Sequence, residues 1–476
     1  MMLREEVKTI IIMISAFLFS IGFIIVLNFV TPSYYITINR ITSLYEPKLN
    51  IEIVILGELF LALGVLGILI NYRLFLRFVL LSLSMIMIIS TILMLIGIKD
   101  LALYNWIIMG ISTHISKYLV IAIPIISISI LMILYVKNKE SLMRHEVNTG
   151  NVRLDPVLDI LLVFAIAIMI FSIPYIPFIN PKGIIIDVDY HYYSKALDLA
   201  RDSLNPLYTL ITWGRCVDRP LFMFFIYVVS NIMNFGVFNK VYMVISIALF
   251  VVLANAVSKV LRLRYSWLIA MLSPIAIGFM YGGFHANLMS LNISLLALYL
   301  SFRKKATVPI LSLISSLIHS EAWLLHTVFF TYDLKTLVLW IIPGGIWWIF
   351  RSIFILPSCP FLESPISGIT SDLGFILNIY LWGVFSNWLF YLVTIIGIIM
   401  MYRKQMSYLV PTLLSMSLLV IPLIVSKELI LRIIMNSLIW IPISQALMSI
   451  RCKEFLIFYT CYQLFFTVTM LVNVVP

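Results

Sequence analysis

Long apolar segments follow one another along almost the whole chain, separated by short polar stretches. Many of them run for about 20 residues, the length that an α-helix needs to cross the hydrocarbon core of a bilayer. Backbone groups in lipid must be hydrogen-bonded internally, and the sequence lacks the alternating segments typical of membrane β-barrels. The pattern therefore predicts an all-α fold, a polytopic bundle of transmembrane helices.

The apolar pattern places about 12 to 14 spans along the chain. The expected helices cover residues 9–30, 52–71, 77–97, 117–136, 157–173, 239–258, 266–281, 285–302, 307–330, 337–355, 373–402, 407–425, 429–448 and 455–475. Between residues 307 and 402 the predicted spans do not alternate consistently between the two sides of the membrane. Half-helices are possible in this region, at His319, Glu321 and Pro343-Gly344-Gly345. Residues 221–234 are short for a span, so we expect a juxtamembrane or re-entrant helix there.

A polar stretch at residues 137–155 divides the chain. Because it is the longest charge-rich segment in the first part of the sequence, we predict a domain boundary here. Residues 1–150 would form an N-terminal unit of four transmembrane helices. Residues 151–476 would form a larger core with a polar loop at residues 174–220.

Composition agrees with a membrane protein, since 62% of the residues are hydrophobic and 11% are charged. The formal net charge of +11 comes from Lys and Arg clusters between the spans, so we expect no nucleic-acid partner. Clusters at residues 4–8, 73–77 and 137–153 fall on one face if each span crosses once, and the positive-inside rule makes this face cytoplasmic. The loop at residues 174–218 is then extracytoplasmic, in a multi-pass protein of the cell membrane.

A polar island with the sequence DVDYHYY lies at residues 187–193, just after an apolar span. Charge is scarce in this chain, so two carboxylates and an imidazole within five positions at a membrane boundary indicate a site that faces water. Asp187 and Asp189 are therefore candidates for a general base or for ligands of a divalent cation, Mg²⁺ or Mn²⁺. The alternative is a solubilising or helix-capping pair, because acidic residues favour helix N-termini. His191 belongs to the same island.

The island leads into a segment with helical periodicity. The apolar positions that share one face are Tyr193, Ala196, Leu197, Ala200 and Leu204. The charged positions of the opposite face are Lys195, Asp198, Arg201 and Asp202. This pattern predicts an amphipathic helix, which either lies in the outer membrane interface or is an ordinary solvated loop helix.

Further polar residues with candidate chemistry stand near the ends of apolar segments. They are Arg215, Asp218, Arg219, His285, His319, Glu321 and Arg432. An arginine can bind phosphate through its planar fork, or it can extend along the apolar surface to lipid headgroups. A His or Glu within an apolar segment either lines a site or forms hydrogen bonds between helices. Cys216 and Cys359 lie in loops that could be on the same side of the membrane, so a disulfide between them is an open alternative.

The order of these elements resembles the GT-C superfamily of integral-membrane glycosyltransferases, especially archaeal members. The resemblance covers residues 155–450. It is carried by DVDYHYYSKAL from residue 187, NP at 205, DRPLF from 218, GGFHANLMSL from 282, LIHSEAW from 317 and LRIIMNSLIWIP from 431. The first 150 residues lie outside the common pattern. The chain has no WWDYG motif, which argues against the oligosaccharyltransferase branch.

The resemblance implies transfer of a sugar from a polyprenyl-phosphate (dolichyl-type) donor to a glycan, lipid or protein acceptor on the outer face. Asp189 would be the catalytic base, and Asp187 would assist it or hold a cation. Arg219 and Arg432 would stabilise the phosphate. The other expected substrate-binding residues are His191, Arg215, Asp218, His285, His319 and Glu321. A transporter or lipid flippase, or a non-catalytic membrane subunit, are the alternatives.

Overall fold

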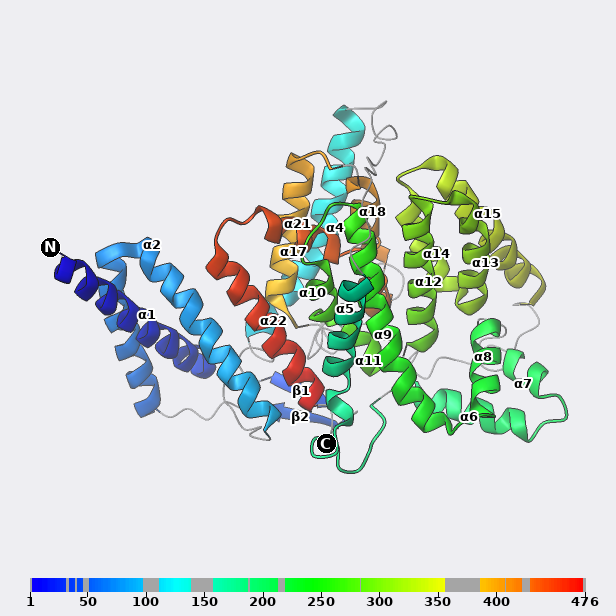
Figure 1. The fold of residues 1–476 in the computed structure, drawn as a ribbon, viewed down its shortest axis with the longest axis horizontal. Coiled ribbons are helices and arrows are strands. Elements are labelled where there is room, and N and C mark those ends of the chain that lie inside the picture. Colours follow the sequence, from blue (N-terminus) through cyan, green and yellow to red (C-terminus); the bar gives the residue numbers. More distant parts are fainter. Residues whose placement is uncertain are drawn as a thin grey trace. The chain divides into compact units, whose positions relative to one another are not determined.

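The computed structural model of the chain describes residues 2–30, 34–38, 41–45, 51–96, 111–137, 157–186, 189–212, 219–282, 284–355, 386–406, 408–421 and 429–473. These ranges are predominantly helical (Figure 1). Within them, six helices are long and apolar enough to cross a membrane: Glu5–Val26, Ile51–Leu95, Tyr118–Val136, Phe235–Val260, Leu334–Ile353 and Lys453–Val472. The protein is therefore a multi-pass membrane protein, as its apolar pattern predicts.

The helices form two compact units. Unit 1 comprises Met1–Val120, Leu377–Leu392 and Ser449–Pro476, and unit 2 comprises Ile121–Ile376 and Val393–Met448. The predicted domain boundary at residue 150 lies outside the described residues, and the division of the chain there stays a prediction.

Unit 1 is built on α1 (Met2–Val30), α2 (Ile51–Leu95) and α22 (Lys453–Asn473), with α2 packed against both other helices. Asn71 interrupts α2 with non-helical dihedral angles (φ −161°, ψ 98°). Its side-chain oxygen accepts a hydrogen bond from the Leu74 amide (3.1 Å) and so caps the second part of the helix. The two parts correspond to the two helices predicted at residues 52–71 and 77–97.

Unit 1 also contains a short antiparallel hairpin, which an all-α fold does not include. Its strands are β1 (Tyr34–Ile38) and β2 (Ile41–Tyr45), and Tyr34 pairs with Tyr45. Both strands are rich in the β-branched and aromatic residues that favour extended backbone. A search for segments long enough to span a membrane misses five-residue strands of this kind.

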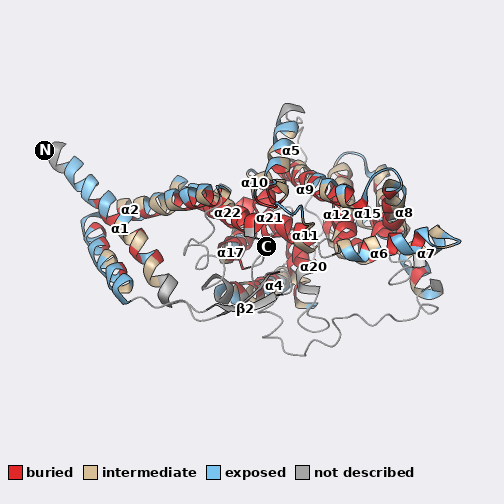
Figure 2. Ribbon diagram, turned by 90° about the horizontal axis from the view of Figure 1, so that it is seen from below, coloured by how far each residue is buried: buried red, intermediate tan, exposed pale blue. Residues whose placement is uncertain are grey.

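Unit 2 contains most of the shorter helices. In chain order they are α5 (Val157–Phe171), η2 (Ile173–Tyr175), α6 (Tyr190–Arg201), α7 (Pro206–Thr212), α8 (Pro220–Ser230), α9 (Phe235–Val260), α10 (Ser266–Met271), α11 (Pro274–Gly282), α12 (His285–Ser301), η3 (Lys305–Thr307), α13 (Val308–Ile318), α14 (Ser320–His326), η4 (Thr327–Phe330), α15 (Leu334–Phe350), the π-helical η5 (Arg351–Ile355), α18 (Leu409–Ser417), α20 (Leu429–Met435) and α21 (Trp440–Ser449). The helices α4 (Ile111–Lys137) and α17 (Trp388–Arg403) contribute residues to both units, and the last residue of α21, Ser449, belongs to unit 1. Buried residues dominate α9, α12 and α21 (Figure 2).

The predicted amphipathic helix corresponds to α6. Its buried residues are Tyr193, Ala196, Leu197 and Ala200, the apolar face expected from the sequence. Leu204, which the pattern assigns to the same face, is fully exposed at 108% because the helix ends at Arg201. The prediction was wrong for this residue, since the periodicity does not show where the last turn ends.

Helix α8 is too short to cross a membrane, at 11 residues or about 16 Å. Both its ends are bonded to α6. Arg219, just before α8, donates to the Tyr193 hydroxyl (2.6 Å), and Arg201 donates to the carbonyl oxygen of Ser230 (3.0 Å). A helix held in this way is in keeping with the prediction that residues 221–234 do not cross.

The segment predicted as one span at residues 307–330 is a helical hairpin. Helix α13 ends at Ile318, the backbone of His319 is extended (φ −160°, ψ 100°), and α14 begins at Ser320. Lys305, before α13, lies 2.6 Å from the carboxylate of Asp333, after η4. The chain therefore leaves this segment at the end where it entered, and the expected single crossing is wrong. We call residues 308–330 the re-entrant hairpin.

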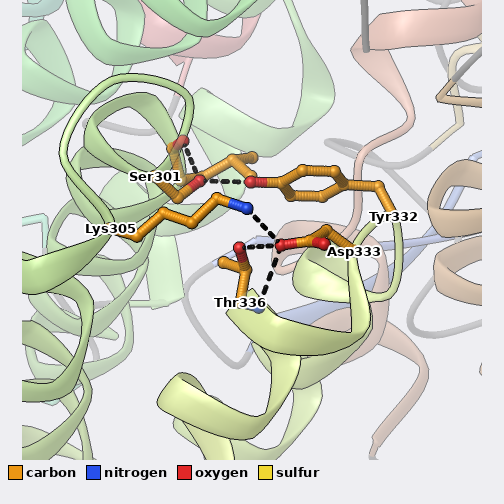
Figure 3. Close-up of polar contacts among 6 residues, drawn as sticks. Ser301, Lys305, Tyr332, Asp333 and Thr336 are labelled. Atoms are coloured by element: carbon orange, nitrogen blue, oxygen red, sulfur yellow. Dashed lines mark hydrogen bonds and ion pairs between the residues drawn. The ribbon is translucent and has the colours of Figure 1, made fainter. Parts of the chain in front are cut away.

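Polar side chains hold the ends of the re-entrant hairpin together (Figure 3). The Asp333 carboxylate accepts hydrogen bonds from Lys305 (2.6 Å) and from the amide (3.0 Å) and hydroxyl of Thr336, and it caps α15. The Tyr332 hydroxyl contacts the Ser301 hydroxyl (2.7 Å) at the end of α12. Partial burial alone would raise the pKa of Asp333, but these hydrogen bonds together lower it below its ordinary value.

Replacing Asp333 by alanine is expected to destabilise the protein by about 1 kcal/mol, the usual effect of losing a helix N-cap. Because the folded-state pKa of Asp333 is depressed, its contribution is present above the unfolded-state pKa of about 3.9 and is lost as pH falls through the folded value. Thermal unfolding of the detergent-solubilised protein at pH 7 and pH 3 measures this effect. The exposed Lys335→Ala is the control, and a deficit in Asp333→Ala that persists undiminished at pH 3 contradicts the assignment.

Helix α15 rises alongside α13 and stays helical through Pro343-Gly344-Gly345, where the sequence left room for a break. The Ser316 hydroxyl donates to the carbonyl oxygen of Gly344 (3.0 Å). A Cβ atom at Gly344 would lie 2.3 Å from Cε2 of Trp323, so only glycine permits this approach of α14. In this pair of candidate breaks, the reversal occurs at His319 and the glycine serves close packing.

The basic clusters of unit 2 gather at one end, which we call the basic end. Two hydrogen bonds show that helices α9 and α12 run parallel. Near the start of both helices, the Tyr242 hydroxyl donates to the His285 carbonyl oxygen (3.2 Å). Further along both helices, Asn292 donates to the Ser246 carbonyl oxygen (2.9 Å). Their C-terminal clusters, at residues 259–264 and 303–305, therefore share that end. The cluster at 403–404 precedes Tyr408, whose ring lies 6.3 Å from that of Phe302.

Labelling of single cysteines on a cysteine-free background tests the re-entrant hairpin. Cysteines at the exposed positions Lys304 and Lys335 are expected to react with an impermeant maleimide from the same side of the membrane. A cysteine at the exposed Lys195 of α6 is expected to react from the opposite side. Opposite reactivity of positions 304 and 335 would contradict the hairpin.

Candidate functional site

The candidate site lies at the end of unit 2 opposite the basic end, where α6, α8, α9 and α12 meet. Tyr193 of α6 is at its centre and is fully buried (0% exposed). Arg219 donates a hydrogen bond to its hydroxyl (2.6 Å). The His285 ring packs edge-on against Tyr193 (5.4 Å between centroids) and stacks on Tyr242 (5.6 Å). With Phe222, these residues form the Tyr193 cluster.

Local sequence explains how these side chains meet. Tyr193 belongs to the apolar stripe of α6, so amphipathicity directs it into the core. Pro220 stands at the first position of α8, where its fixed φ starts a helix and leaves Arg219 as the residue just outside. Asn234 caps α9 by accepting a hydrogen bond from the Gly236 amide (2.9 Å). These helix starts bring Arg219, Tyr242 and His285 to one end of the bundle.

The electrostatics of the Tyr193 cluster keep the phenol protonated. Burial raises the pKa of Tyr193 well above its ordinary value; the positive charge of Arg219 opposes the rise, and the negative charge of Asp189 adds to it. The Tyr193 hydroxyl oxygen accepts a hydrogen bond from Arg219, and its O–H group can donate a hydrogen bond to another acceptor. Asp189 precedes α6, yet its side chain makes no capping hydrogen bond. Helix capping therefore does not account for this carboxylate.

A charged pair lies beside the Tyr193 cluster. Arg432 of α20 forms an ion pair with Glu321 of α14 (3.2 Å), and its guanidinium lies over the ring of Phe284 (5.7 Å). Phe284 directly precedes His285, so the Arg432–Glu321 pair lies next to the Tyr193 cluster. The side chains of Arg432 and Glu321 are 21% and 43% exposed, so this pair is open to solvent or ligand. Phe284, Glu321 and Arg432 form the Arg432 cluster.

His319 has a structural task at the reversal of the re-entrant hairpin. It is fully buried (0% exposed), and its Nδ1 accepts a hydrogen bond from the Ala322 amide (3.3 Å) at the start of α14. This contact favours the alternative of a histidine that stabilises the fold. A role for His319 in substrate binding stays a prediction.

Sequence reasoning missed a buried polar chain below the Arg432 cluster. Nε2 of His326 lies 2.8 Å from Oδ1 of Asn436, and its Nδ1 lies 2.8 Å from the Ser294 hydroxyl. That hydroxyl contacts Ser315 (3.1 Å), which in turn contacts Ser290 (2.8 Å). A signal was present in the i,i+4 spacing of Ser290 and Ser294 within an apolar helix. These groups are neutral, so the pattern of charges along the chain does not reveal them.

The remaining predicted residues divide into two groups. Asp187, Arg215 and Asp218 lie outside the described residues, as do Cys216 and Cys359 of the disulfide left open. His191 is exposed on α6, with its ring 5.4 Å from that of Tyr190. Within the described part of the chain, no group of three or more His, Cys, Asp or Glu residues could hold a metal ion. Because Asp187 is not among these residues, the proposed cation site at Asp187 and Asp189 stays a prediction.

The arrangement combines a carboxylate not used for capping, a protonated phenol, an imidazole and two guanidinium groups at one end of an apolar helical unit. Such a set can bind an anionic group and accept a proton beside it. No family model, curated protein or solved structure matches the chain.

Proposed function

We propose that the protein is a membrane glycosyltransferase that moves a sugar from a polyprenyl-phosphate donor to an acceptor on the outer face of the membrane. The observation that carries the proposal is the juxtaposition of Asp189, Tyr193 and Arg219 beside the Arg432–Glu321 pair. A carboxylate beside guanidinium groups matches a reaction that removes a proton from a hydroxyl and releases a phosphate.

In the proposed reaction, the Asp189 carboxylate takes the proton of the acceptor hydroxyl. The hydroxyl oxygen attacks the anomeric carbon of the sugar and forms the new glycosidic bond. The bond between that carbon and the phosphate oxygen breaks, and its electron pair leaves with the polyprenyl phosphate. Arg219 and Arg432 neutralise the charge that develops on the leaving phosphate. Attack from the opposite face inverts the configuration at the anomeric carbon.

The positive-inside rule supports the orientation of this site. If residues 221–234 and the re-entrant hairpin do not cross, the basic clusters at residues 259–264, 303–305 and 403–404 all fall on the cytoplasmic side. The hairpin thereby removes the mismatch between residues 307 and 402. The Tyr193 cluster then faces outward in the cell membrane, where a dolichyl-type donor and a glycan, lipid or protein acceptor would meet.

A reconstituted transfer assay tests the proposal. The purified protein in liposomes is supplied with synthetic polyprenyl-phosphate hexoses and with membrane extract as the source of acceptor. We expect the protein to convert one of these donors to free polyprenyl phosphate, together with a glycosylated product. A folded protein that neither binds nor consumes any member of the donor panel would contradict it.

The re-entrant hairpin favours a second candidate, a transporter or lipid flippase. Transporters place broken helices and polar side chains at membrane depth around a substrate site. This function predicts movement of a polyprenyl-phosphate sugar between the leaflets of the liposome without cleavage of the sugar–phosphate bond. Product analysis in the same liposomes separates the two candidates. A non-catalytic subunit would show neither activity.

A further inference from the structure

The Asn436 side chain defines which nitrogen of His326 carries the proton. Asn436 follows α20, and its Nδ2 donates to the carbonyl oxygen of Arg432 (2.7 Å). Its Oδ1 therefore faces Nε2 of His326, 2.8 Å away, and an amide oxygen can only accept. The opposite amide orientation would place two oxygens against each other at Arg432. The proton of a neutral His326 is consequently on Nε2. Nδ1 is then an acceptor that faces the Ser294 hydroxyl (2.8 Å), whose other acceptor is the Ser290 carbonyl oxygen (2.8 Å).

This pair connects the two helices that carry the Arg432 cluster. His326 is five residues after Glu321 on the α14 segment, and Asn436 is four residues after Arg432 at the end of α20. About one helical turn therefore separates the His326–Asn436 contact from the Glu321–Arg432 ion pair on each helix. Two contacts one turn apart fix the position of one helix along the other.

The His326–Asn436 contact is buried and is linked to further buried polar residues. His326, Ser294 and Ser315 are fully buried at 0% exposure, and Asn436 is 3% exposed. Hydrogen bonds in such a site are costly to leave unmade, because a buried polar group without its partner keeps its full desolvation penalty. The serines connect His326 to α12, in which buried residues dominate, and to the buried face of α13.

We propose that His326 and Asn436 are positioning residues that hold Arg432 towards the phosphate of the ligand. This inference rests on the proposed function for the identity of the ligand. His326 touches neither ligand nor reacting atoms; it acts through Asn436 on the backbone of Arg432. Arg432 is held at two points: its carbonyl oxygen accepts a hydrogen bond from Asn436, and its guanidinium forms an ion pair with Glu321.

Binding of unsugared polyprenyl phosphate to the protein in nanodiscs tests the proposal. His326→Phe keeps a ring and removes both hydrogen bonds, and we expect it to weaken binding about tenfold, as for one lost hydrogen bond to a charged group. His326→Gln retains a donor and an acceptor and is expected to restore part of the affinity. The control is Ser266→Ala, which removes a buried hydrogen bond to Ser444 near the basic end and is expected to leave the affinity unchanged.

A double-mutant cycle separates positioning from a general effect on the fold. If His326 acts through Arg432, His326→Phe is expected to cause no further loss of affinity in an Arg432→Ala protein. The same tenfold loss in that background would overturn the proposal. Should His326→Phe fail to fold, Asn436→Ala takes its place in the cycle.

A spectroscopic measurement makes the outcome independent of the ligand. In ¹⁵N-labelled protein, His326 is expected to show the Nε2–H tautomer, and the Arg432 side-chain resonance is expected to shift in Asn436→Ala. If the wild type binds no polyprenyl phosphate but this resonance shifts, the proposed function fails and the positioning role stands. An Nδ1–H tautomer, or an Arg432 resonance that is the same in wild type and variant, overturns the positioning role.

Discussion

Replacement of Asp189 by asparagine is expected to lower the rate of sugar transfer by about 10²–10⁴-fold, the usual effect of removing a positioned general base. The amide keeps the shape of the carboxylate but has no comparable basicity. Asp189 makes no capping hydrogen bond at the start of α6, so its replacement leaves that helix intact. Binding of the donor is therefore expected to change little, and the loss to appear in kcat.

The matched control for Asp189→Asn is Asp198→Asn, on the exposed face of the same helix. Asp198 lies 3.6 Å from Arg201 in an exposed pair, which contributes little to stability. Near-wild-type transfer by a folded Asp189→Asn protein would remove this residue from the mechanism. Asp187→Asn is expected to be milder if Asp187 only assists, and equally severe if both acids ligate a cation, in which case a chelator also stops the reaction.

Replacement of Arg432 by alanine is expected to lower kcat/KM by about 10²–10³-fold, as the loss of one group that stabilises developing charge usually does. Arg432→Lys is expected to recover only part of the rate, because a lysine cannot donate two parallel hydrogen bonds to a phosphate. Glu321→Gln is expected to have a smaller effect than Arg432→Ala, since the amide still accepts from the guanidinium.

The control for the arginine series is Arg303→Ala. Arg303 lies at the basic end, with its guanidinium 5.0 Å from the Tyr299 ring, far along α12 from Phe284. We expect it to leave kcat/KM within about twofold of wild type, as for a surface substitution away from the site. Equal losses in Arg432→Ala and Arg303→Ala would mean that net charge, not the position of Arg432, controls the rate.

Helices whose apolar segment coincides with the buried helix of the structure could be predicted from the sequence. Both α9 and α22 follow from their length alone, and the buried face of α6 follows from its periodicity. The reversal at His319 could not be located in this way. It depends on the pairing of Lys305 with Asp333 across the re-entrant hairpin and on a glycine that admits Trp323. Such contacts join residues that are distant in sequence, and hydropathy carries no information about them.

The candidate site could be predicted in part for a similar reason. Charged residues in an apolar chain are conspicuous, so Asp189, Arg219, Glu321 and Arg432 could be selected one by one. Their grouping depends on the packing of Tyr193 against His285 and of Arg432 over Phe284, which only the fold provides. His326 was missed because its partners Ser294 and Asn436 are 32 and 110 residues away in sequence, so no local pattern marks it.

The most direct measurement of the central claim is mass spectrometry of lipid-linked sugars and surface glycans in cells that naturally make the protein. Three strains are compared: one lacking the protein, and the same strain complemented with wild type or with Asp189→Asn. Transfer from a polyprenyl-phosphate donor predicts that one lipid-linked sugar accumulates and one glycan residue disappears, both in the absence of the protein and with Asp189→Asn. Lipid-linked sugars and glycans that are identical in all three strains would contradict it.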